Sequence, residues 1–257
     1  MSDRMIETLL SLNRDFYSRF ADSFAITRSR IWPGFSRLLA HIPCGSTVLD
    51  LGCGNGRLAH YLAEQKQGIT YLGLDFSARL IALARDWASG LENIAAEFRV
   101  VDVTRPGWAS TVLPARFDTV LALAVLQHIA GHRLRLEVVR QASSFLPVDG
   151  VLLMSHWQFT SSPRTRGKIV PWSVVGIEEA DLDPGDYLLD WRGGGVGYRY
   201  CRLIDEEEMI GLAADAGLLL VETYRADGWE ENLNLYCVLK HAAAPGGRRA
   251  TASGPSG

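Results

Sequence analysis

Three glycines alternate in the turn G-C-G-N-G at residues 52–56, and this turn is the part of the chain best suited to hold a ligand. Glycine lets the backbone turn sharply and lets a bulky ligand lie against it without meeting a Cβ atom. The apolar run 48–51 predicts a buried strand before the turn, and 57–67 predicts a helix after it. Together they form the first half of a nucleotide-binding βαβ unit. Asp50 precedes the first glycine by two residues. Its carboxylate suits a ligand with a cationic amino-acid end better than a pyrophosphate, which it would repel.

Carboxylates end the next two expected strands. The strand 69–74 ends on Asp75, nineteen residues after Gly56. A carboxylate about 20 residues beyond such a turn can accept hydrogen bonds from both hydroxyls of a ribose. The strand 97–101 ends at Asp102, and the same patterning predicts strands at 117–123, 150–154, 218–224 and 233–240. Acidic strand ends in this order favour a bound cofactor over a tight glycine turn without a ligand.

These residues resemble a known family. The motif D-L-G-C-G-N-G at 50–56 is similar to the first motif of class I methyltransferases that use S-adenosylmethionine (AdoMet). The resemblance implies that Asp102 contacts the adenine amino group and that segment 124–129 lies beside the reactive methyl group. The residues expected to bind AdoMet are Asp50, Gly52, Gly54, Gly56, Asp75, Phe76, Asp102, Val103, Leu123 and Ala124.

The elements that must position these residues follow from the alternation of strands and helices. We expect one α/β domain over 43–241 with a doubly wound, mostly parallel, seven-stranded Rossmann-like methyltransferase sheet. Residues 1–42 are expected to form an N-terminal helical cap over the cofactor. Residues 158–200 contain several Pro and Gly and are expected to form a long inserted loop that acts as a lid. The Gly, Ala, Ser and Pro content of 242–257 predicts a disordered tail.

The composition narrows the class of protein. Apolar residues make up 47% of the 257 residues, enough for a sheet buried under helices on both faces. The net charge of −3 argues against a large nucleic-acid footprint. Four cysteines without a C-x-x-C pair predict small buried residues rather than a disulfide framework or a metal site. No signal segment and no run of about 20 apolar residues is present, so we expect a cytoplasmic protein without a membrane span.

The flanking segments are similar to tRNA wobble-uridine methyltransferases, which convert 5-carboxymethyluridine into its methyl ester. The similarity lies in Tyr17, Phe20-Ala21, Phe24, Thr27-Arg28 and Trp32-Pro33 and in segments 185–191, 198–203 and 224–229. It extends from about residue 17 to residue 239. It implies tRNA as the substrate and a small zinc-binding activator subunit as a partner. The chain departs from the family pattern at Asp190, Cys201-Arg202 and Gly228, which leaves the identity of the acceptor open.

A carboxylate acceptor sets the chemistry expected of the site. Methyl transfer is an in-line displacement, and a carboxylate is already ionised at neutral pH, so no strong general base is needed. A cationic clamp is needed instead, and Arg28 and Arg199 are the candidates. His128 is the candidate base if the acceptor is a hydroxyl; as a neutral packed residue it would only wall the site. The residues expected to contact the acceptor are Trp32, Trp191, Tyr198, Tyr200 and Arg202.

Each of these side chains also has a purely structural interpretation. Arg28 can instead bind the carboxylate of AdoMet or pair with Asp22. The tryptophans can be core residues, since burial is the commonest role of large rings. Arg199 and Arg202 can lie on a solvated strand face, and the basic segment 164–168 can be a solvated surface rather than a phosphate contact.

Two other functions stay open at this point. One is a small-molecule O- or N-methyltransferase with residues 158–200 as its lid. The other is a methyltransferase-like scaffold without catalysis. The intact Asp50, glycine turn, Asp75 and Asp102 argue against the scaffold, because a degenerate site is expected to lose some of them.

Overall fold

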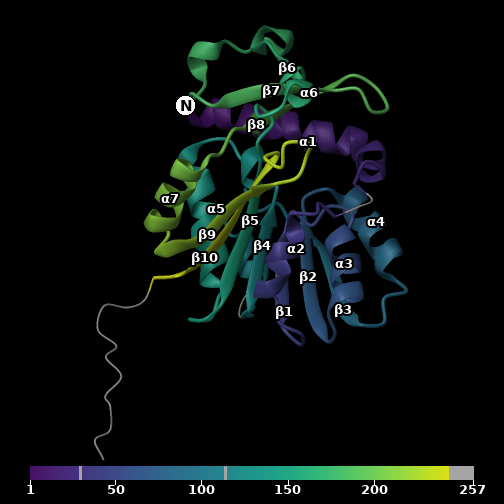
Figure 1. Cartoon of the computed structure of the whole chain (residues 1–257). Helices are drawn as coiled ribbons and strands as arrows, with labels where there is room; N and C mark the ends of the chain where they lie inside the picture. Colours follow the sequence, from purple (N-terminus) through teal and green to yellow (C-terminus); the bar gives the residue numbers. More distant parts are fainter. Residues whose placement is uncertain (29–30, 113–114, 243–257) are drawn as a thin grey trace, which may run out of the picture.

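A seven-stranded sheet forms the centre of the molecule in the computed structural model, which describes residues 1–28, 31–112 and 115–242 (Figure 1). The strand order is β3-β2-β1-β4-β5-β10-β9. Only β10 runs antiparallel to its two neighbours, and the other neighbouring pairs are parallel. The strands are β1 Thr47–Leu51, β2 Ile69–Asp75, β3 Ile94–Val100, β4 Thr119–Leu123, β5 Val151–Trp157, β9 Leu218–Ala226 and β10 Asn234–His241. The predicted doubly wound, mostly parallel, seven-stranded sheet is confirmed.

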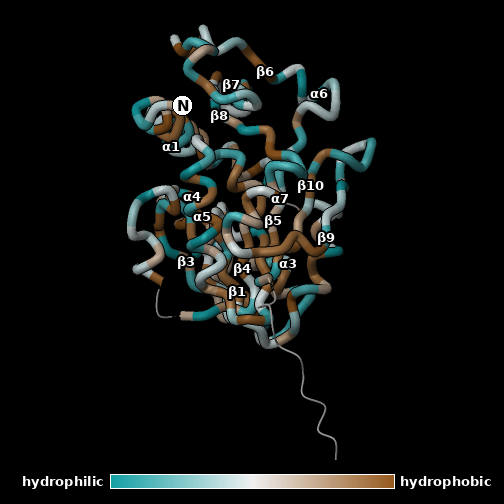
Figure 2. Tube along the Cα trace, turned by 90° about the vertical axis from the view of Figure 1, so that its left-hand side faces the viewer, coloured by the Kyte–Doolittle hydropathy of each residue, from teal (hydrophilic) through white to brown (hydrophobic). Residues whose placement is uncertain are grey.

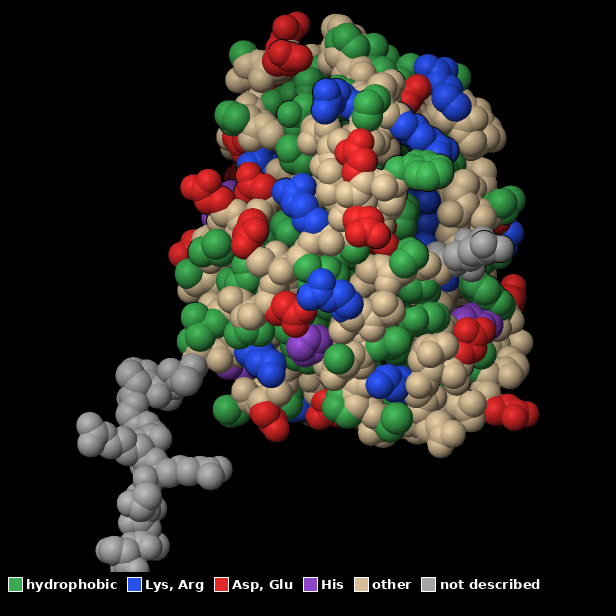
Figure 3. Space-filling model, viewed as in Figure 1, with side chains coloured by type: hydrophobic (Ala, Val, Ile, Leu, Met, Phe, Trp, Pro, Cys, Tyr) green, Lys and Arg blue, Asp and Glu red, His purple; other side chains and the backbone are tan. Residues whose placement is uncertain are grey.

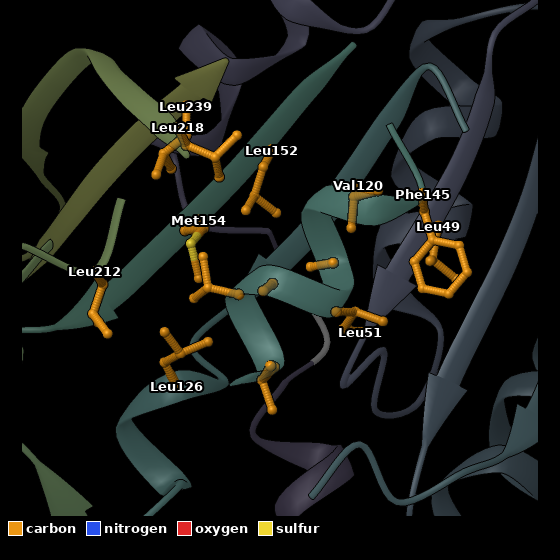
Figure 4. Close-up of a cluster of buried hydrophobic side chains, with 14 of the residues drawn as sticks. Leu49, Leu51, Val120, Leu126, Phe145, Leu152, Met154, Leu212, Leu218 and Leu239 are labelled. Atoms are coloured by element: carbon orange, nitrogen blue, oxygen red, sulfur yellow. The ribbon is translucent and has the colours of Figure 1, made fainter. Parts of the chain in front are cut away.

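Helices cover both faces of this sheet. On one face, α5 (His132–Ser144) and α7 (Glu206–Asp215) enclose the hydrophobic cluster of Figure 4, which includes leucines of β1, β5 and β10 and Leu212 of α7. On the other face, α2 (Phe35–Leu38), α3 (Arg57–Gln65) and α4 (Ala78–Ala88) pack around a second cluster. Figure 2 shows the hydrophobic segments gathered between these layers.

Strand β1 divides its side chains between the two clusters. Leu49 and Leu51 belong to the cluster under α5 and α7, whereas Val48 belongs to the cluster under α3 and α4. Successive side chains of a strand point to opposite faces. Asp50 therefore points to the same face as Val48, toward Tyr71 of β2.

A second layer lies over the carboxyl ends of the parallel strands (Figure 1). It consists of α1 (Asp3–Ile26) and of an antiparallel sheet of β6 (Ile169–Val170), β7 (Asp186–Trp191) and β8 (Gly197–Arg202). The expected long loop at 158–200 is therefore wrong. The segment folds into this sheet, the short helix α6 (Pro163–Arg166) and two 3-10 turns, because its apolar strand residues can bury against α1.

The N-terminal segment is shared between the two layers. Phe16, Tyr17 and Phe20 of α1 pack against Leu80 of α4 and Trp191 of β7. Residues 35–42 do not join α1 over the cofactor site, because Phe35, Leu38 and Ile42 lie in the cluster under α3 and α4. The expected disordered tail lies outside the described residues, except for Ala242.

Two further expectations concern cysteines and membranes. Cys53, Cys201 and Cys237 are buried free thiols, but Cys44 is exposed, so the expectation of buried cysteines is wrong for that residue. Within the described ranges, no helix has both the length and the apolar character that crossing a bilayer demands.

Candidate active site

A cavity of about 880 Å³ lies at the carboxyl ends of the parallel strands, below α1 and the insert. Strands β1 and β4 are neighbours there, and the strand order reverses between them. Open α/β sheets bind ligands at such a point. The volume is near the upper end of the range of roughly 300–1,000 Å³ found for small-molecule sites. Of the predicted site residues, the cavity wall includes Arg28, Trp32, Gly52, Gly54, Asp75, Phe76, Asp102, Val103, Leu123, Ala124, His128, Trp191 and Arg199.

The glycine turn forms one wall of this cavity. Its backbone is tied to β2, because Leu74 O accepts hydrogen bonds from Gly52 N at 2.7 Å and from Cys53 N at 2.9 Å. Gly54 has a φ of +59°, and a Cβ atom placed there would meet nothing within 4 Å. The space beside Gly54 is therefore open to a ligand.

Gly56 has a different role from the one predicted. It does not line the cavity, and a Cβ atom on it would lie 3.0 Å from Ala84 Cβ and 3.2 Å from the Phe98 ring. Gly56 thus allows α3 to pack closely against α4 and β3, and its assignment as a cofactor contact is corrected to a packing role.

The two acidic strand ends face the cavity as expected. Asp75 Oδ2 accepts a hydrogen bond from Gly54 N at 3.0 Å, and Oδ1 accepts one from Ser77 N at 2.9 Å. Each oxygen keeps a second lone pair with which it can accept a ribose hydroxyl. Burial raises the pKa of Asp75 to about 6, against the opposing effect of the two backbone hydrogen bonds. Asp102 Oδ1 is held by the backbone N–H and hydroxyl of Thr104.

Asp50 lies below the turn and outside the cavity wall. It is 3% exposed and accepts a hydrogen bond from the Tyr71 hydroxyl. Burial raises the pKa of Asp50 to about 7, although the Tyr71 hydrogen bond opposes this shift. Strand alternation turns the Asp50 side chain toward the α3 face, and its contact with the cationic end of the cofactor stays a prediction. Arg57, the first residue of α3, lines the cavity instead.

Arg199 of β8 is a buried cation on the cavity wall. It is 2% exposed, and none of the described residues forms an ion pair with it. Its guanidinium lies 5.3–6.0 Å from four aromatic ring centroids, those of Phe16, Phe24, Trp157 and Trp191. Aromatic faces attract a cation, but a buried charge without a counterion is costly. This environment therefore favours an anionic ligand beside Arg199.

His128 and Tyr17 form a hydrogen-bonded pair next to Arg199. His128 Nδ1 lies 3.3 Å from Tyr200 O, which can only accept, so Nδ1 carries the proton. Nε2, 3.1 Å from the Tyr17 oxygen, then accepts from the Tyr17 hydroxyl. Burial, assisted by the charge of Arg199, lowers the pKa of His128 to about 3. His128 is therefore neutral at pH 7 and a weak base, and this geometry fits a positioning role better than the predicted catalytic one.

Asn13 of α1 connects this pair to β8. Its amide nitrogen donates to His128 O at 3.1 Å and to Tyr200 O at 3.2 Å, and its amide oxygen accepts from Tyr200 N at 2.8 Å. Sequence reasoning missed Asn13, although a signal exists: it is a polar residue among the apolar residues Leu9, Leu10 and Phe16 that α1 buries. One buried side chain thus fixes α1, His128 and the strand that carries Arg199.

Arg28 and Trp32 lie on the cavity wall near the end of α1. The Arg28 guanidinium lies 4.6 Å from the Phe24 ring centroid. Burial and the charge of Arg199 lower the pKa of Arg28 to about 10, so it remains charged at pH 7. The alternative pairing of Arg28 with Asp22 is absent from the ion pairs of the described residues, and Asp22 pairs with Arg79 at 2.7 Å instead.

Three predicted acceptor contacts lie outside the cavity wall. Tyr198, Tyr200 and Arg202 have the same parity on β8, opposite to that of Arg199, so they point to the other face. Tyr200 is fully buried and donates to Asp186, and Arg202 pairs with Glu208 at 2.9 Å. These residues hold the insert together, and their assignment to the acceptor is corrected. Trp191 lines the cavity but is packed on Phe16 and donates its indole N–H to Gly193 O, as expected of a core residue.

Comparison with known proteins identifies the class. Residues 44–173 match the model of a methyltransferase domain family, and the chain belongs to this family. The predicted AdoMet-dependent methyltransferase is therefore confirmed at the level of the class.

Several individual relatives have names that specify a tRNA substrate. The tRNA (carboxymethyluridine(34)-5-O)-methyltransferase of Schizosaccharomyces pombe is 25% identical over 224 residues, which cover 83% of this chain and 91% of that protein. The protein of the same name from Saccharomyces cerevisiae is 30% identical over 61% of this chain and 54% of its own length. A bovine probable tRNA methyltransferase 9B is 28% identical over 62% of this chain, which spans only 32% of the bovine protein.

Solved structures share the fold at low identity. A SAM-dependent methyltransferase from Methanosarcina mazei covers 82% of this chain, and the match covers 98% of that protein, with a TM-score of 0.62 and 18% identity. An amino pentose methyltransferase from Micromonospora echinaspora, solved with bound SAM, covers 86% of this chain, and the match covers 96% of that protein, with a TM-score of 0.54 and 19% identity.

Proposed function

We propose that this chain transfers a methyl group from AdoMet to a carboxylate oxygen, and that the carboxylate belongs to a carboxymethyl group on the wobble uridine of tRNA. The observation that carries the proposal is Arg199, a buried guanidinium on the cavity wall to which none of the described acidic side chains is paired. A carboxylate acceptor would supply the missing counterion. A neutral amine or hydroxyl acceptor would leave Arg199 without a counterion.

AdoMet fits the opposite side of the cavity. The open space at Gly54, the carboxylate of Asp75 and the segment Asp102–Val103 line one continuous wall, which matches a ligand with a ribose and an adenine. When bound, AdoMet would supply an electrophilic methyl group on a sulfonium. Arg57 lines the same wall and would meet the amino-acid end of AdoMet.

The protein then has to hold the acceptor in line with the methyl group. Arg199 and Arg28 would bind the carboxylate and fix one of its oxygens. Tyr17 and His128, which are hydrogen-bonded to each other, would close the wall behind the carboxylate and exclude water. Trp32 would pack against the uracil ring. No residue needs to remove a proton, since the carboxylate is ionised at neutral pH.

The relatives support the tRNA acceptor, because the yeast proteins named above carry that activity in their names. A second candidate is a small carboxylic acid. The observation in its favour is the acidic side of the cavity mouth, where Glu230 and Glu231 are exposed and would repel RNA phosphates. A scaffold without catalysis is disfavoured by the open cavity and its unpaired buried cation.

A small zinc-binding activator subunit remains part of this proposal. Strands β3 and β9 are the outer strands of the described sheet. Val100 on β3 and Leu219 and Val221 on β9 are about half exposed. A partner strand could pair with either edge. Copurification with such a subunit, and faster methyl transfer in its presence, would support this part.

The test of the function is methyl transfer from radiolabelled AdoMet to total tRNA from cells that lack their own wobble-uridine esterifying enzyme. Nuclease digestion then locates the label. Label in an alkali-labile uridine ester supports the tRNA acceptor. Absence of label, with AdoMet binding intact by calorimetry and with the activator present, refutes it and favours the small carboxylic acid.

A further inference from the structure

The loop between β9 and β10 carries a fully exposed tryptophan at the mouth of the cavity. Trp229 has a relative exposure of 102% and yet belongs to the cavity wall. Single exposed apolar side chains are common, but this ring lies beside the candidate binding cavity, where its face is available for a planar group to stack on. Figures 1 and 2 show this loop below the level of α6, on the same side of the molecule.

The loop is anchored at its base rather than loosely exposed. Asp227 is buried and has a φ of +70°, which is unfavourable for a residue with a side chain. Its carboxylate accepts three hydrogen bonds, from Gly34 N at 2.7 Å, Asn234 Nδ2 at 2.8 Å and the Tyr236 hydroxyl at 2.7 Å. The backbone is closed by a hydrogen bond from Leu233 N to Asp227 O at 3.0 Å. These contacts offset the strain and anchor the base of the loop that carries Trp229.

The two sides of the mouth differ in charge. Arg164 of α6 is exposed, Lys168 is half-buried, and within the described part of the chain neither forms an ion pair. On the side of Trp229, Glu230 and Glu231 are exposed. Figure 3 shows several Lys and Arg side chains on the upper part of this face, with Asp and Glu side chains among them. An anionic phosphate is therefore better placed against α6 than against the loop, where Trp229 offers a stacking face to an uncharged, planar group.

We propose that Trp229 and α6 bind the nucleotide next to the methylated one, with its base stacked on Trp229 and its phosphate against Arg164 and Lys168. This inference rests on the proposed function, because a single-stranded RNA loop with one nucleotide in the cavity must place the neighbouring nucleotide at the mouth. Stacking on an aromatic side chain accepts any base, so the site contributes affinity without reading sequence.

The experiment compares two substrates: the free nucleoside 5-carboxymethyluridine, and an RNA stem–loop that carries this nucleoside in its loop. In Trp229→Ala, kcat/KM for the stem–loop should fall roughly 5- to 150-fold further than kcat/KM for the nucleoside, which corresponds to about 1–3 kcal/mol. Trp229→Phe should restore part of the ratio of kcat/KM for the stem–loop to kcat/KM for the nucleoside. Trp87→Ala is the matched control, because Trp87 is also a partly exposed tryptophan, 41% exposed on α4, but stacks on His60 outside the cavity. It should leave the ratio unchanged.

Salt dependence separates the phosphate contact from the stacking contact. Arg164→Gln should lower the slope of log Kd against log salt for the stem–loop by about one, whereas Trp229→Ala should weaken binding without changing the slope. If Trp229→Ala changes the substrate ratio no more than Trp87→Ala does, the nucleotide site is refuted while tRNA methylation stands. That result would also be expected if Trp229 served a protein partner. If the wild-type protein methylates neither RNA nor nucleoside with the activator subunit present and AdoMet binding intact, both proposals fail.

Discussion

Two buried arginines should respond to the same substitution with opposite signs. Arg199 and Arg135 are 2% and 1% exposed, but Arg135 forms an ion pair with Glu208 at 2.9 Å, and Arg199 has no carboxylate within reach among the described residues. Arg199→Met removes an uncompensated buried charge, whereas Arg135→Met leaves a buried carboxylate with fewer partners. The comparison isolates the counterion, since both variants remove a guanidinium from the interior.

The magnitudes follow from the surroundings of each residue. Burying one ion costs several kcal/mol, and the aromatic faces near Arg199 lie at 5.3–6.0 Å, close to the limit of about 6 Å for such contacts, so that they offset only part of this cost. Arg199→Met should therefore stabilise the ligand-free protein by about 1–3 kcal/mol and raise Tm by about 2–10 °C. Arg135→Met should destabilise it by about 2–4 kcal/mol, less than for an isolated pair, because Arg202 also contacts Glu208.

The second part of this test measures the methyl-transfer activity of the Arg199→Met variant. Loss of a charged group that orients the reacting oxygen should lower kcat/KM for the carboxylate substrate by about 10²- to 10³-fold in Arg199→Met. AdoMet affinity, measured by calorimetry, should change far less. The assays are urea unfolding at pH 7.5 and steady-state methyl transfer. A destabilised Arg199→Met variant, or one that keeps wild-type kcat/KM, would refute the reasoning that this cation is held for an anionic acceptor.

Three further changes test the cofactor wall and the anchoring of β8. Asp75→Asn should raise the Kd of AdoMet about 10- to 100-fold in calorimetry. The affinity of the wild-type protein for AdoMet should also weaken as the pH falls through about 6, the pKa of Asp75. A Kd that does not change with pH would contradict the assignment of Asp75 to the ribose. The pKa of Asp50 is raised from 3.8 to about 7 in the folded protein, so its ionisation opposes folding, with no penalty below pH 4 and the full penalty above pH 7. Asp50→Asn should thus increase the free energy of unfolding at pH 8 by up to about 4 kcal/mol and have little effect near pH 4, and an equal effect at both pH values would disprove this. Asn13→Ala should destabilise the protein by about 2–4 kcal/mol and lower kcat more than AdoMet affinity, whereas a loss of stability alone would limit Asn13 to a structural role.

Much of the sheet and of the cofactor wall could be predicted because their signals are local. Apolar runs of strand length, glycines at alternate positions and a carboxylate at a strand end each reflect interactions within a few residues. The positions of β1, β2 and β4, the cavity-facing Gly54 and the strand ends at Asp75 and Asp102 follow from such runs. The direction of the Asp50 side chain did not follow from such runs, because it depends on which face of the sheet Val48 occupies, and only packing decides that.

Which side chains face the methyl acceptor depended on the tertiary structure. The tyrosines and arginines of 198–202 were all plausible contacts in sequence, but pairing of β8 with β7 and its contact with α1 turn Arg199 toward the cavity and Tyr198, Tyr200 and Arg202 away from it. Likewise, α1 brings Asn13 and Tyr17 to His128 across more than a hundred residues. The sequence by itself determined the class of fold and the type of cofactor, because those depend on short-range patterns. Only the tertiary structure decided which cation lacks a counterion and which tryptophan faces water, because burial and charge pairing are properties of the whole fold.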